Sequence, residues 1–469
     1  MLEAVIGLEL HIEMNTKSKM FSCAPVSYGK VANTSCDLLD FAFPGTLPTV
    51  NKQAVINAVR LCNALNMEID DILVFDRKNY FYSDLPKGYQ ITQQFRPIGR
   101  NGYLTLKLKD YDKKIEINRL HLEEDTCKQI HDGESTYIDY NRAGIPLIEL
   151  VTYPTMTSGL EAKKFVESIR SMIVYLNISE GKMEEGNLRV DVNVSMKEKE
   201  SDFLGNKVEI KNINTLSNIE SAIDYEIDRQ SKIILSGHKV KQETRRYDES
   251  KKATISLRDK FNDVDYRYFT DSNIPPIKLS EDFIKSAIES SPELASERYE
   301  RYRFLGLSDY DSSLLVSDKV ISDYFDDGLK SGCSPKLLAN WVNGEVKSIL
   351  NKNSVINVDA IELGKLIKLI EEKRISNSQA KEAFFKAIKA NKSPLEIVSE
   401  CGYSLTSNDE EILINIKKII DSNPALVVDY KAGRDKVVGY LVGQVMKATK
   451  GKADPITVNK LSKEELKRR

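Results

Sequence analysis

The most regular pattern along the chain is an alternation of polar and apolar residues from Asn187 to Met196. The polar positions are Asn187, Arg189, Asp191, Asn193 and Ser195, and an apolar residue follows each of them. Because the side chains of a β-strand point alternately to opposite faces, this pattern predicts a strand with one buried and one polar face. The polar face carries short hydrogen-bonding groups and one arginine, unlike an ordinary solvated strand face.

The same two-residue period recurs in three other segments, at 5–14, 103–109 and 114–122. Turn sequences rich in glycine, proline and asparagine separate them, as expected between strands. Three further segments have helical periodicity, at 52–66, 158–176 and 216–235. The N-terminal part is therefore predicted to be of the α+β class, with a largely antiparallel sheet.

After 272–277 the pattern changes to helical periodicity, with serine, aspartate and asparagine at N-cap positions. A polar break at 402–411 divides this helical part. The 469 residues exceed the size at which one hydrophobic core keeps growing, so several domains are expected. We predict domains at 1–291, 292–405 and 406–469, the last two built of helices only.

The net charge of −2 argues against a uniformly basic nucleic-acid coat but conceals a basic tail. Residues 431–469 hold eleven lysines and arginines against four acidic residues, a net charge of +7. Such a tail suits a large polyanion.

The six cysteines are scattered, without a CxxC pair, so we expect reduced thiols in a cytosolic protein. The N-terminus has no basic region before its apolar residues, and nowhere are eighteen consecutive residues apolar. We therefore expect a cytoplasmic protein with no signal peptide and no membrane span.

Candidate metal ligands lie in three separate segments of the chain. Glu9 and His11 project from the same strand face, about 7 Å apart. They could belong to an exposed strand face, or they could be a pair of metal ligands. Glu149 lies in the apolar segment 143–154, where a carboxylate is costly unless it is paired or bound to metal. Glu124 belongs to three adjacent acidic residues, which suit a solvated turn or a nearby cation. Together, these four side chains have the hard-ligand composition that suits Mg²⁺.

Candidate nucleotide-binding residues lie in two other places. Segment 76–94 interleaves cations with aromatic residues, among them Lys78 and Tyr82, which suits a phosphate and a flat base or a plain surface loop. The second place combines the polar face of 187–195 with Glu209 and Lys211. Neither a GxxxxGK[ST] loop nor a GxGxxG after a strand is present, so a nucleotide would have to bind on an open sheet face.

Several long motifs in one order resemble a known family. They include "GLELHIEMNTKSKMFS", "DRKNYFYSDLPKGYQITQ", "YNRAGIPLIELVT", "MEEGNLRVDVNVS", "EIKNINTL", "QETRRYDE", "DYRYF" and "NWVNGE", and the tail "DYKAGRDKVVGYLVGQVMKATKGKADPITVNKLS". These motifs cover essentially the whole chain and resemble the B subunits of the aspartyl/glutamyl-tRNA amidotransferase, the GatB family.

The resemblance implies ATP-dependent amidation of Glu-tRNA(Gln), Asp-tRNA(Asn) or both. An acyl phosphate would form on the side-chain carboxylate, and ammonia channelled from an amidase subunit would displace the phosphate. A small third subunit would make the complex a heterotrimer, and no DNA ligand is expected. The resemblance also implies an N-terminal cradle related to the glutamine synthetase and guanidino kinase fold, and a tRNA-binding tail.

The resemblance carries roles over to particular residues. It implies a metal site of Glu9, His11, Glu124 and Glu149, with Lys78, Glu124 and Asp191 as catalytic groups. The nucleotide and its phosphates would lie near Tyr82, Arg189, Asp191, Glu209 and Lys211. Some family members carry a four-cysteine zinc site before "PGTLP", but here that region retains only Cys23 and Cys36, so we expect no zinc.

Two alternatives remain beside this interpretation. The chain could be a non-catalytic scaffold that holds tRNA within the same complex, which the basic tail would also suit. The second alternative is a free-standing carboxylate–amine ligase, although such an enzyme would have little use for a basic tail. A buried Glu149 and the Arg/Asp strand face favour catalysis over the scaffold.

Overall fold

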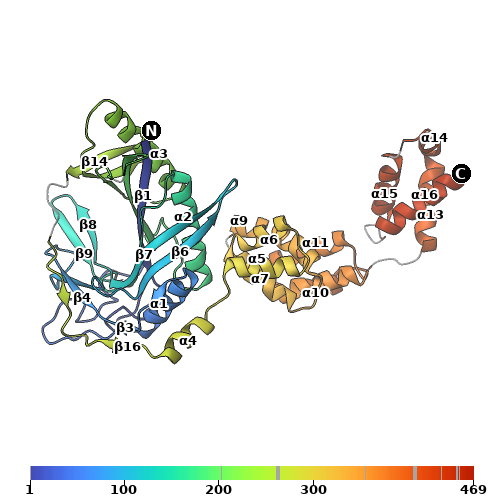
Figure 1. The fold of residues 1–469 in the computed structure, drawn as a ribbon. Helices are drawn as coiled ribbons and strands as arrows, with labels where there is room; N and C mark the ends of the chain where they lie inside the picture. Colours follow the sequence, from blue (N-terminus) through green and yellow to red (C-terminus); the bar gives the residue numbers. More distant parts are fainter. Residues whose placement is uncertain are drawn as a thin grey trace. The chain divides into compact units, whose positions relative to one another are not determined.

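The computed structural model describes residues 2–201, 203–259, 265–353, 355–404, 409–434, 436–449, 453 and 455–469. The chain divides into two compact units, Met1–Leu294 and Ala295–Arg469 (Figure 1). The boundary expected between 405 and 406 lies outside the described residues and stays a prediction. No described helix has the length and apolar character that crossing a membrane requires.

The first unit is built on a nine-stranded sheet with the order β14-β13-β12-β11-β1-β10-β7-β6-β2. Neighbouring strands are antiparallel, as predicted, except for the parallel pair β12 and β13. The strands are β1 (Leu2–Glu13), β2 (Glu68–Ile69), β6 (Gly99–Lys107), β7 (Asp112–Glu124), β10 (Pro146–Thr152), β11 (Leu188–Glu198), β12 (Val208–Lys211), β13 (Glu243–Asp248) and β14 (Ala253–Asp259).

Helices cover one face of this sheet, and the other face is largely polar. The helices predicted at 52–66, 158–176 and 216–235 are confirmed as α1 (Lys52–Ala64), α2 (Gly159–Tyr175) and α3 (Leu216–Leu235). Asn51, Ser158 and Thr215 cap their N-termini through side-chain oxygens. The apolar positions of β1 and β11 pack in the core beneath the helices, which leaves the alternate positions on the open face.

Smaller sheets of two or three strands accompany the main sheet in the described part of this unit. They are β15 (Phe269–Thr270), β4 (Asp76–Asn79) and β5 (Tyr89–Thr92) in one sheet, β3 (Ile72–Leu73) with β16 (Ile277–Lys278), and β8 (Lys128–Asp132) with β9 (Ser135–Asp139). The side-chain oxygen of Gln93 accepts a 3.0 Å hydrogen bond from the backbone of Leu122, which joins the end of β5 to β7. The first unit ends with α4 (Glu281–Glu289).

The described part of the second unit is helical, as predicted. Its helices are α5 (Ala295–Phe304), α6 (Asp309–Val316), α7 (Lys319–Leu329), α8 (Pro335–Trp341), the π-helical turn η1 (Val342–Val346), α9 (Lys347–Asn353), α10 (Ala360–Glu371), α11 (Asn377–Ala390), α12 (Pro394–Glu400), α13 (Asp409–Ser422), α14 (Ala425–Lys431), α15 (Lys436–Ala448) and α16 (Pro455–Arg468). One hydrophobic cluster spans Tyr302–Ile397, and another spans Ile412–Leu466.

Candidate functional site

The register of the central strands brings polar residues from distant segments into one row. His11 on β1 lies opposite Glu149 on β10 and opposite Arg189 on β11. Glu149 in turn lies opposite His121 on β7. Residues directly opposite each other in antiparallel strands project from the same face, so Arg189, His11, Glu149 and His121 follow one another across the open face.

Two histidines and two carboxylates meet in this row. Nε2 of His11 lies 3.4 Å from Oε2 of Glu149 and 3.5 Å from Oε1 of Glu123. Nε2 of His121 lies 3.1 Å from the same Glu149 oxygen and 3.5 Å from Oε2 of Glu123. Glu123 and His121 are buried, so the cluster is a set of ionisable groups largely withdrawn from water.

The groups of this cluster control one another's protonation. Burial opposes a charged His121, but the carboxylates of Glu149 and Glu123 raise its pKa to about 9. The same balance raises the pKa of His11. Burial would also raise the pKa of Glu149, but the two imidazoles hold it well below its usual range. Without a bound cation, the histidines therefore neutralise the carboxylates.

The cluster fits a divalent metal. One ligand atom each from His11, Glu123 and Glu149 lies within 4.8 Å of the others. Among the described residues, this is the set of three histidine, cysteine or acidic side chains whose ligand atoms are close enough to share a metal ion. Two carboxylates and an imidazole match the hard and borderline ligands of Mg²⁺ or Mn²⁺. The chemistry of this donor set agrees with the metal that the sequence predicts.

Glu124, one of the four expected ligands, lies outside the cluster of ligand atoms. Its carboxylate pairs with Lys87 and accepts a 3.0 Å hydrogen bond from the backbone of Ile91, so it is already engaged with β5 and its preceding turn. Its neighbour Glu123 joins the cluster because adjacent strand residues point to opposite faces. His121 and Glu123 have the same two-residue spacing as Glu9 and His11, a signal that could have identified them.

Glu9 also lies outside the cluster of ligand atoms. It projects from the open face of β1 opposite Asp191, and Oε1 accepts a 2.9 Å hydrogen bond from Asn193. Of the four expected ligands, the structure thus brings together His11 and Glu149.

The expected nucleotide group is partly assembled. Nζ of Lys211 lies 2.9 Å from Asp191 and 3.3 Å from Glu209, and Thr244 donates a 2.9 Å hydrogen bond to Glu209. Burial disfavours the charged amine, but both carboxylates raise the pKa of Lys211. Arg189, Asp191 and Lys211 border one cavity of about 590 Å³, together with His11 and residues 183–186.

Arg189 is oriented by Asp125, the last of the three adjacent acidic residues in the sequence. Its guanidinium donates a 2.9 Å hydrogen bond to the buried Asp125, which lies 3.6 Å from Arg142. Burial opposes ionisation of Asp125, but Arg189 and Arg142 lower its pKa. Burial and the nearby Asp125 charge raise the pKa of Glu13 to about 7.

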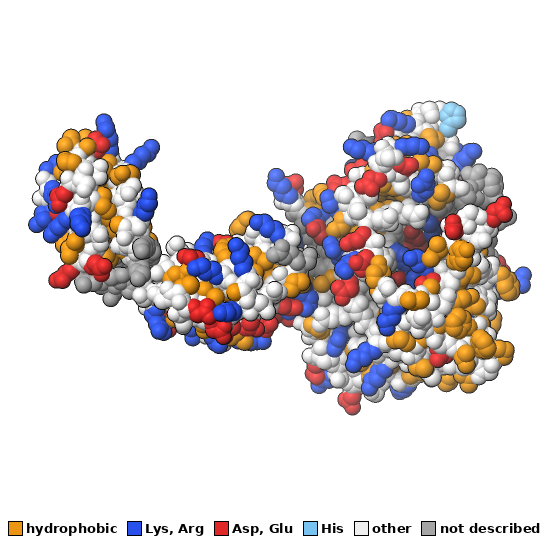
Figure 2. All heavy atoms as spheres, turned by 180° about the vertical axis from the view of Figure 1, so that it is seen from behind, with side chains coloured by type: hydrophobic (Ala, Val, Ile, Leu, Met, Phe, Trp, Pro, Cys, Tyr) orange, Lys and Arg blue, Asp and Glu red, His pale blue; other side chains and the backbone are white. Residues whose placement is uncertain are grey.

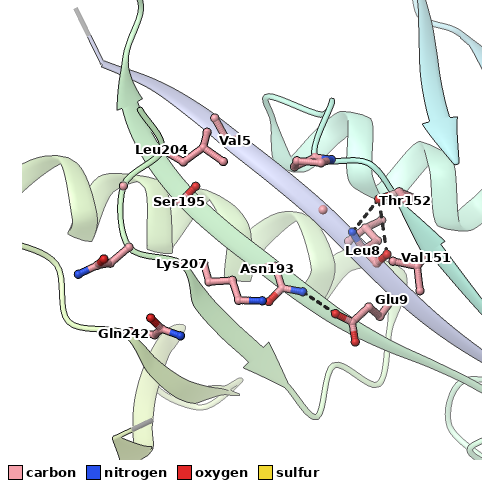
Figure 3. Close-up of a pocket in the computed structure, with 14 residues that line it drawn as sticks. Val5, Leu8, Glu9, Val151, Thr152, Asn193, Ser195, Leu204, Lys207 and Gln242 are labelled. Carbon is pink, nitrogen blue, oxygen red and sulfur yellow. Dashed lines mark hydrogen bonds between the residues drawn. The ribbon is translucent and has the colours of Figure 1, made fainter. Parts of the chain in front are cut away.

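A second cavity of about 450 Å³ opens where β1 and β10 separate (Figure 3). The pairing of these strands ends at Glu9 and Val151, and the backbone amide of Leu8 donates to the Thr152 hydroxyl at 2.9 Å. Pro154, which has no amide hydrogen, and Gly7, which has no side chain, leave the space open. Its walls mix apolar groups with polar ones that Figure 3 labels Glu9, Asn193, Ser195, Lys207 and Gln242.

The two expected residues of segment 76–94 differ in environment. Lys78 lies on β4 with Nζ 4.8 Å from the ring centre of Tyr266. Tyr82 lies in the loop between β4 and β5 and is 61% exposed. Glu123 and Glu149 raise the pKa of the Lys78 amine, so Lys78 lies within electrostatic range of the cluster, whereas Tyr82 faces solvent.

Charges of both signs are mixed on the face drawn in Figure 2, in keeping with the net charge of −2. Of the basic residues in the tail, Lys450 and Lys452 lie outside the described residues.

Comparison with known proteins gives matches along most of the chain. A family model described as the GatB/GatE catalytic domain matches residues 4–285, and one described as the GatB domain matches residues 323–466. A protein of Mycoplasma capricolum is 44% identical over 466 residues, covering 98% of this chain and 97% of its own. A protein of Bacillus cytotoxicus is 42% identical over 473 residues, which cover 100% of this chain and 99% of that protein. Both are named as the B subunit of an aspartyl/glutamyl-tRNA(Asn/Gln) amidotransferase.

Proposed function

The chain belongs to the GatB family, and from this membership we propose that it is the component of a tRNA amidotransferase that activates a side-chain carboxylate with ATP. The substrate is Glu-tRNA(Gln), Asp-tRNA(Asn) or both, and the product carries the corresponding amide. An amidase subunit supplies the ammonia, and the complex also contains a small third subunit.

The observation that carries this proposal is the cluster of His11, Glu123 and Glu149 beside the Asp191–Lys211 pair on one open sheet face. Phosphoryl transfer requires groups that neutralise the triphosphate and hold it in line with the attacking oxygen. When bound by the cluster, Mg²⁺ supplies this charge neutralisation. A purely structural sheet face would gain nothing from so many ionisable groups at the edge of the core.

The reaction explains why ATP is needed. A carboxylate is a poor electrophile because its charge repels the nucleophile and oxide is a poor leaving group. Phosphorylation removes both obstacles, and ammonia then displaces phosphate. In this proposal Lys211 and Arg189 contact phosphates, Asp191 orients the reacting groups, and the cationic Lys78 faces the activated carboxylate.

The two cavities suggest how the nucleotide lies. Gly7 and His11 are four residues apart on β1, about 13 Å by strand geometry, a span suited to an extended nucleoside triphosphate. The cavity in Figure 3 would take the base, since it combines apolar walls with the side-chain amides of Asn193 and Gln242. The phosphates would then run toward Lys211 and the cluster, on a cradle of the glutamine synthetase type.

The decisive experiment is co-expression with the amidase and the small third protein of the complex, followed by amidation assays on both misacylated tRNAs. We expect amide formation that requires ATP and either glutamine or ammonia. The Glu149→Gln variant should lose tRNA-dependent ATP hydrolysis while the complex still assembles and hydrolyses glutamine. A chain that only held tRNA would be unaffected by this change, so normal ATP hydrolysis would refute the catalytic role.

A further inference from the structure

Lys78 has an unusual environment for a lysine close to two carboxylates. Burial opposes its charge, but Glu123, Tyr268 and Glu149 raise the pKa of the amine, so the side chain remains a cation. Within the described part of the chain, its Nζ has no hydrogen bond or ion pair. The contact that it makes is with the ring face of Tyr266, at 4.8 Å from the ring centre.

A ring face holds an ammonium group differently from a carboxylate. The attraction is electrostatic, because the negative face of the ring meets the cation, and it uses no lone pair. All three N–H donors of the amine therefore remain available for a ligand. The ring also restricts the flexible four-carbon stem, which otherwise samples many rotamers.

Tyr266 is itself held firmly. The backbone amide of Asn79 donates to the carbonyl of Tyr266 at 2.9 Å, and the Asn79 side chain donates to the carbonyl of Arg267 at 2.7 Å. Arg267 has a φ of 46°, in the left-handed region that non-glycine residues rarely adopt. Because Asn79 follows Lys78 in β4, the same strand carries the cation and the residue whose hydrogen bonds fix the backbone of Tyr266.

Two neighbouring aromatic rings pack against Tyr266. Tyr80 and Tyr268 approach it edge to face, with ring centres 6.1 and 6.0 Å away. These tyrosines belong to the "DYRYF" motif and to segment 76–94, and the site described above gives Tyr266 no role.

We propose that Tyr266 is a positioning residue that holds the ammonium group of Lys78, through its ring face, toward the activated carboxylate of the substrate. This inference rests on the proposed function, because it requires Lys78 to act on that group. The role belongs to the aromatic ring and does not depend on the tyrosine hydroxyl.

The test compares Tyr266→Leu with Tyr266→Phe in the assembled complex. Tyr266→Leu should lower kcat for amidation roughly three- to thirty-fold, the range expected for a lost cation–π contact, with KM for tRNA unchanged. Tyr266→Phe keeps the ring and should retain near-normal kcat. Asn79→Ala, which releases the backbone at 266–267, should give a smaller loss, and glutamine hydrolysis by the partner reports assembly.

A double-mutant cycle with Lys78→Met shows whether Tyr266 acts through the lysine. In the Lys78→Met background, Tyr266→Leu should cause no further loss. The inference is overturned if the losses multiply, or if Tyr266→Phe is as damaging as Tyr266→Leu. Normal amidation by Lys78→Met would also overturn the inference, but it would leave the proposed amidation function intact. Absence of amidation in the unmodified complex would refute the proposed function itself.

Discussion

Glu123 and Glu124 are adjacent in β7, yet their carboxylates have different partners. Glu123 lies 3.5 Å from both His11 and His121, whereas Glu124 pairs with Lys87 and the backbone of Ile91. The two residues thus form a natural matched pair, with the same chemistry at neighbouring positions and different expected roles.

Glu123→Gln should weaken Mn²⁺ binding by roughly tenfold or more, because it removes a charged group from the ligand cluster. Glu124→Gln should leave metal affinity within about twofold, since this carboxylate lies outside the cluster. Isothermal titration of each variant with Mn²⁺ measures both. Equal losses in the two variants would show that the cluster in the structure is not the metal site.

Metal binding should release protons. In the metal-free protein, His121 has a pKa of about 9 and His11 a raised pKa, so protons occupy the cluster at pH 7. A cation bound by Glu123 and Glu149 repels them, and His11 must be neutral to act as a ligand. Affinity should therefore rise from pH 6 toward about 9 and then level off. Calorimetry in buffers of different ionisation enthalpy counts the protons, and identical heats in all buffers would contradict this prediction.

Local patterns predicted much of this site, but long-range pairing completed it. Alternation correctly placed Glu9 and His11 on one strand face, and the helices near 52, 158 and 216 were evident from periodicity. The meeting of His11 with Glu149 depends on pairing across more than a hundred residues, and register is set by whole strands packing on a core. Three consecutive acidic residues gave no indication of which one joins the cluster.

The sequence indicated one wall of the cavity beside Gly7, the polar face with Asn193 and Ser195, but not the opening itself. It arises where β10 leaves the pairing with β1, and Thr152 bonds the amide of Leu8 with its side chain. Irregularities of this kind arise from the packing of neighbouring strands, so residue types alone do not indicate them. A single glycine in a strand-like segment is compatible with many structures.

Gly7→Val should fill this cavity and reduce ATP affinity by roughly tenfold or more. A Cβ at Gly7 would meet Pro154 and Thr152 at 3.7–3.9 Å, an ordinary contact, so the strand itself tolerates a side chain. Binding of magnesium tripolyphosphate should be unchanged, because the proposed phosphate site is near Lys211 and not in this cavity. Gly7→Ala, with a smaller side chain, should have a weaker effect. An equal loss of tripolyphosphate binding would indicate distortion of the sheet.

Val192 and Asp191 separate stability from activity on the same strand. Val192 is fully buried, so Val192→Ala should lower the free energy of unfolding by about 2 kcal/mol through lost burial and the cavity left behind. Asp191→Asn should lower amidation while leaving the unfolding midpoint nearly unchanged, since Asp191 is half-buried on the open face. Denaturant unfolding and amidation kinetics of both variants test the contrast.

Deletion of 406–469 should weaken tRNA binding while glutamine hydrolysis by the amidase continues. The tail from 431 onward has a net charge of +7, and each phosphate that it neutralises adds to the salt dependence of binding. The deletion should therefore flatten the plot of log affinity against log salt concentration as well as lower affinity. A matched control replaces tail lysines with glutamine, which removes charge and keeps the chain length. If affinity and salt slope both stay the same after deletion, tRNA is held by the remaining residues of the chain or by its partners.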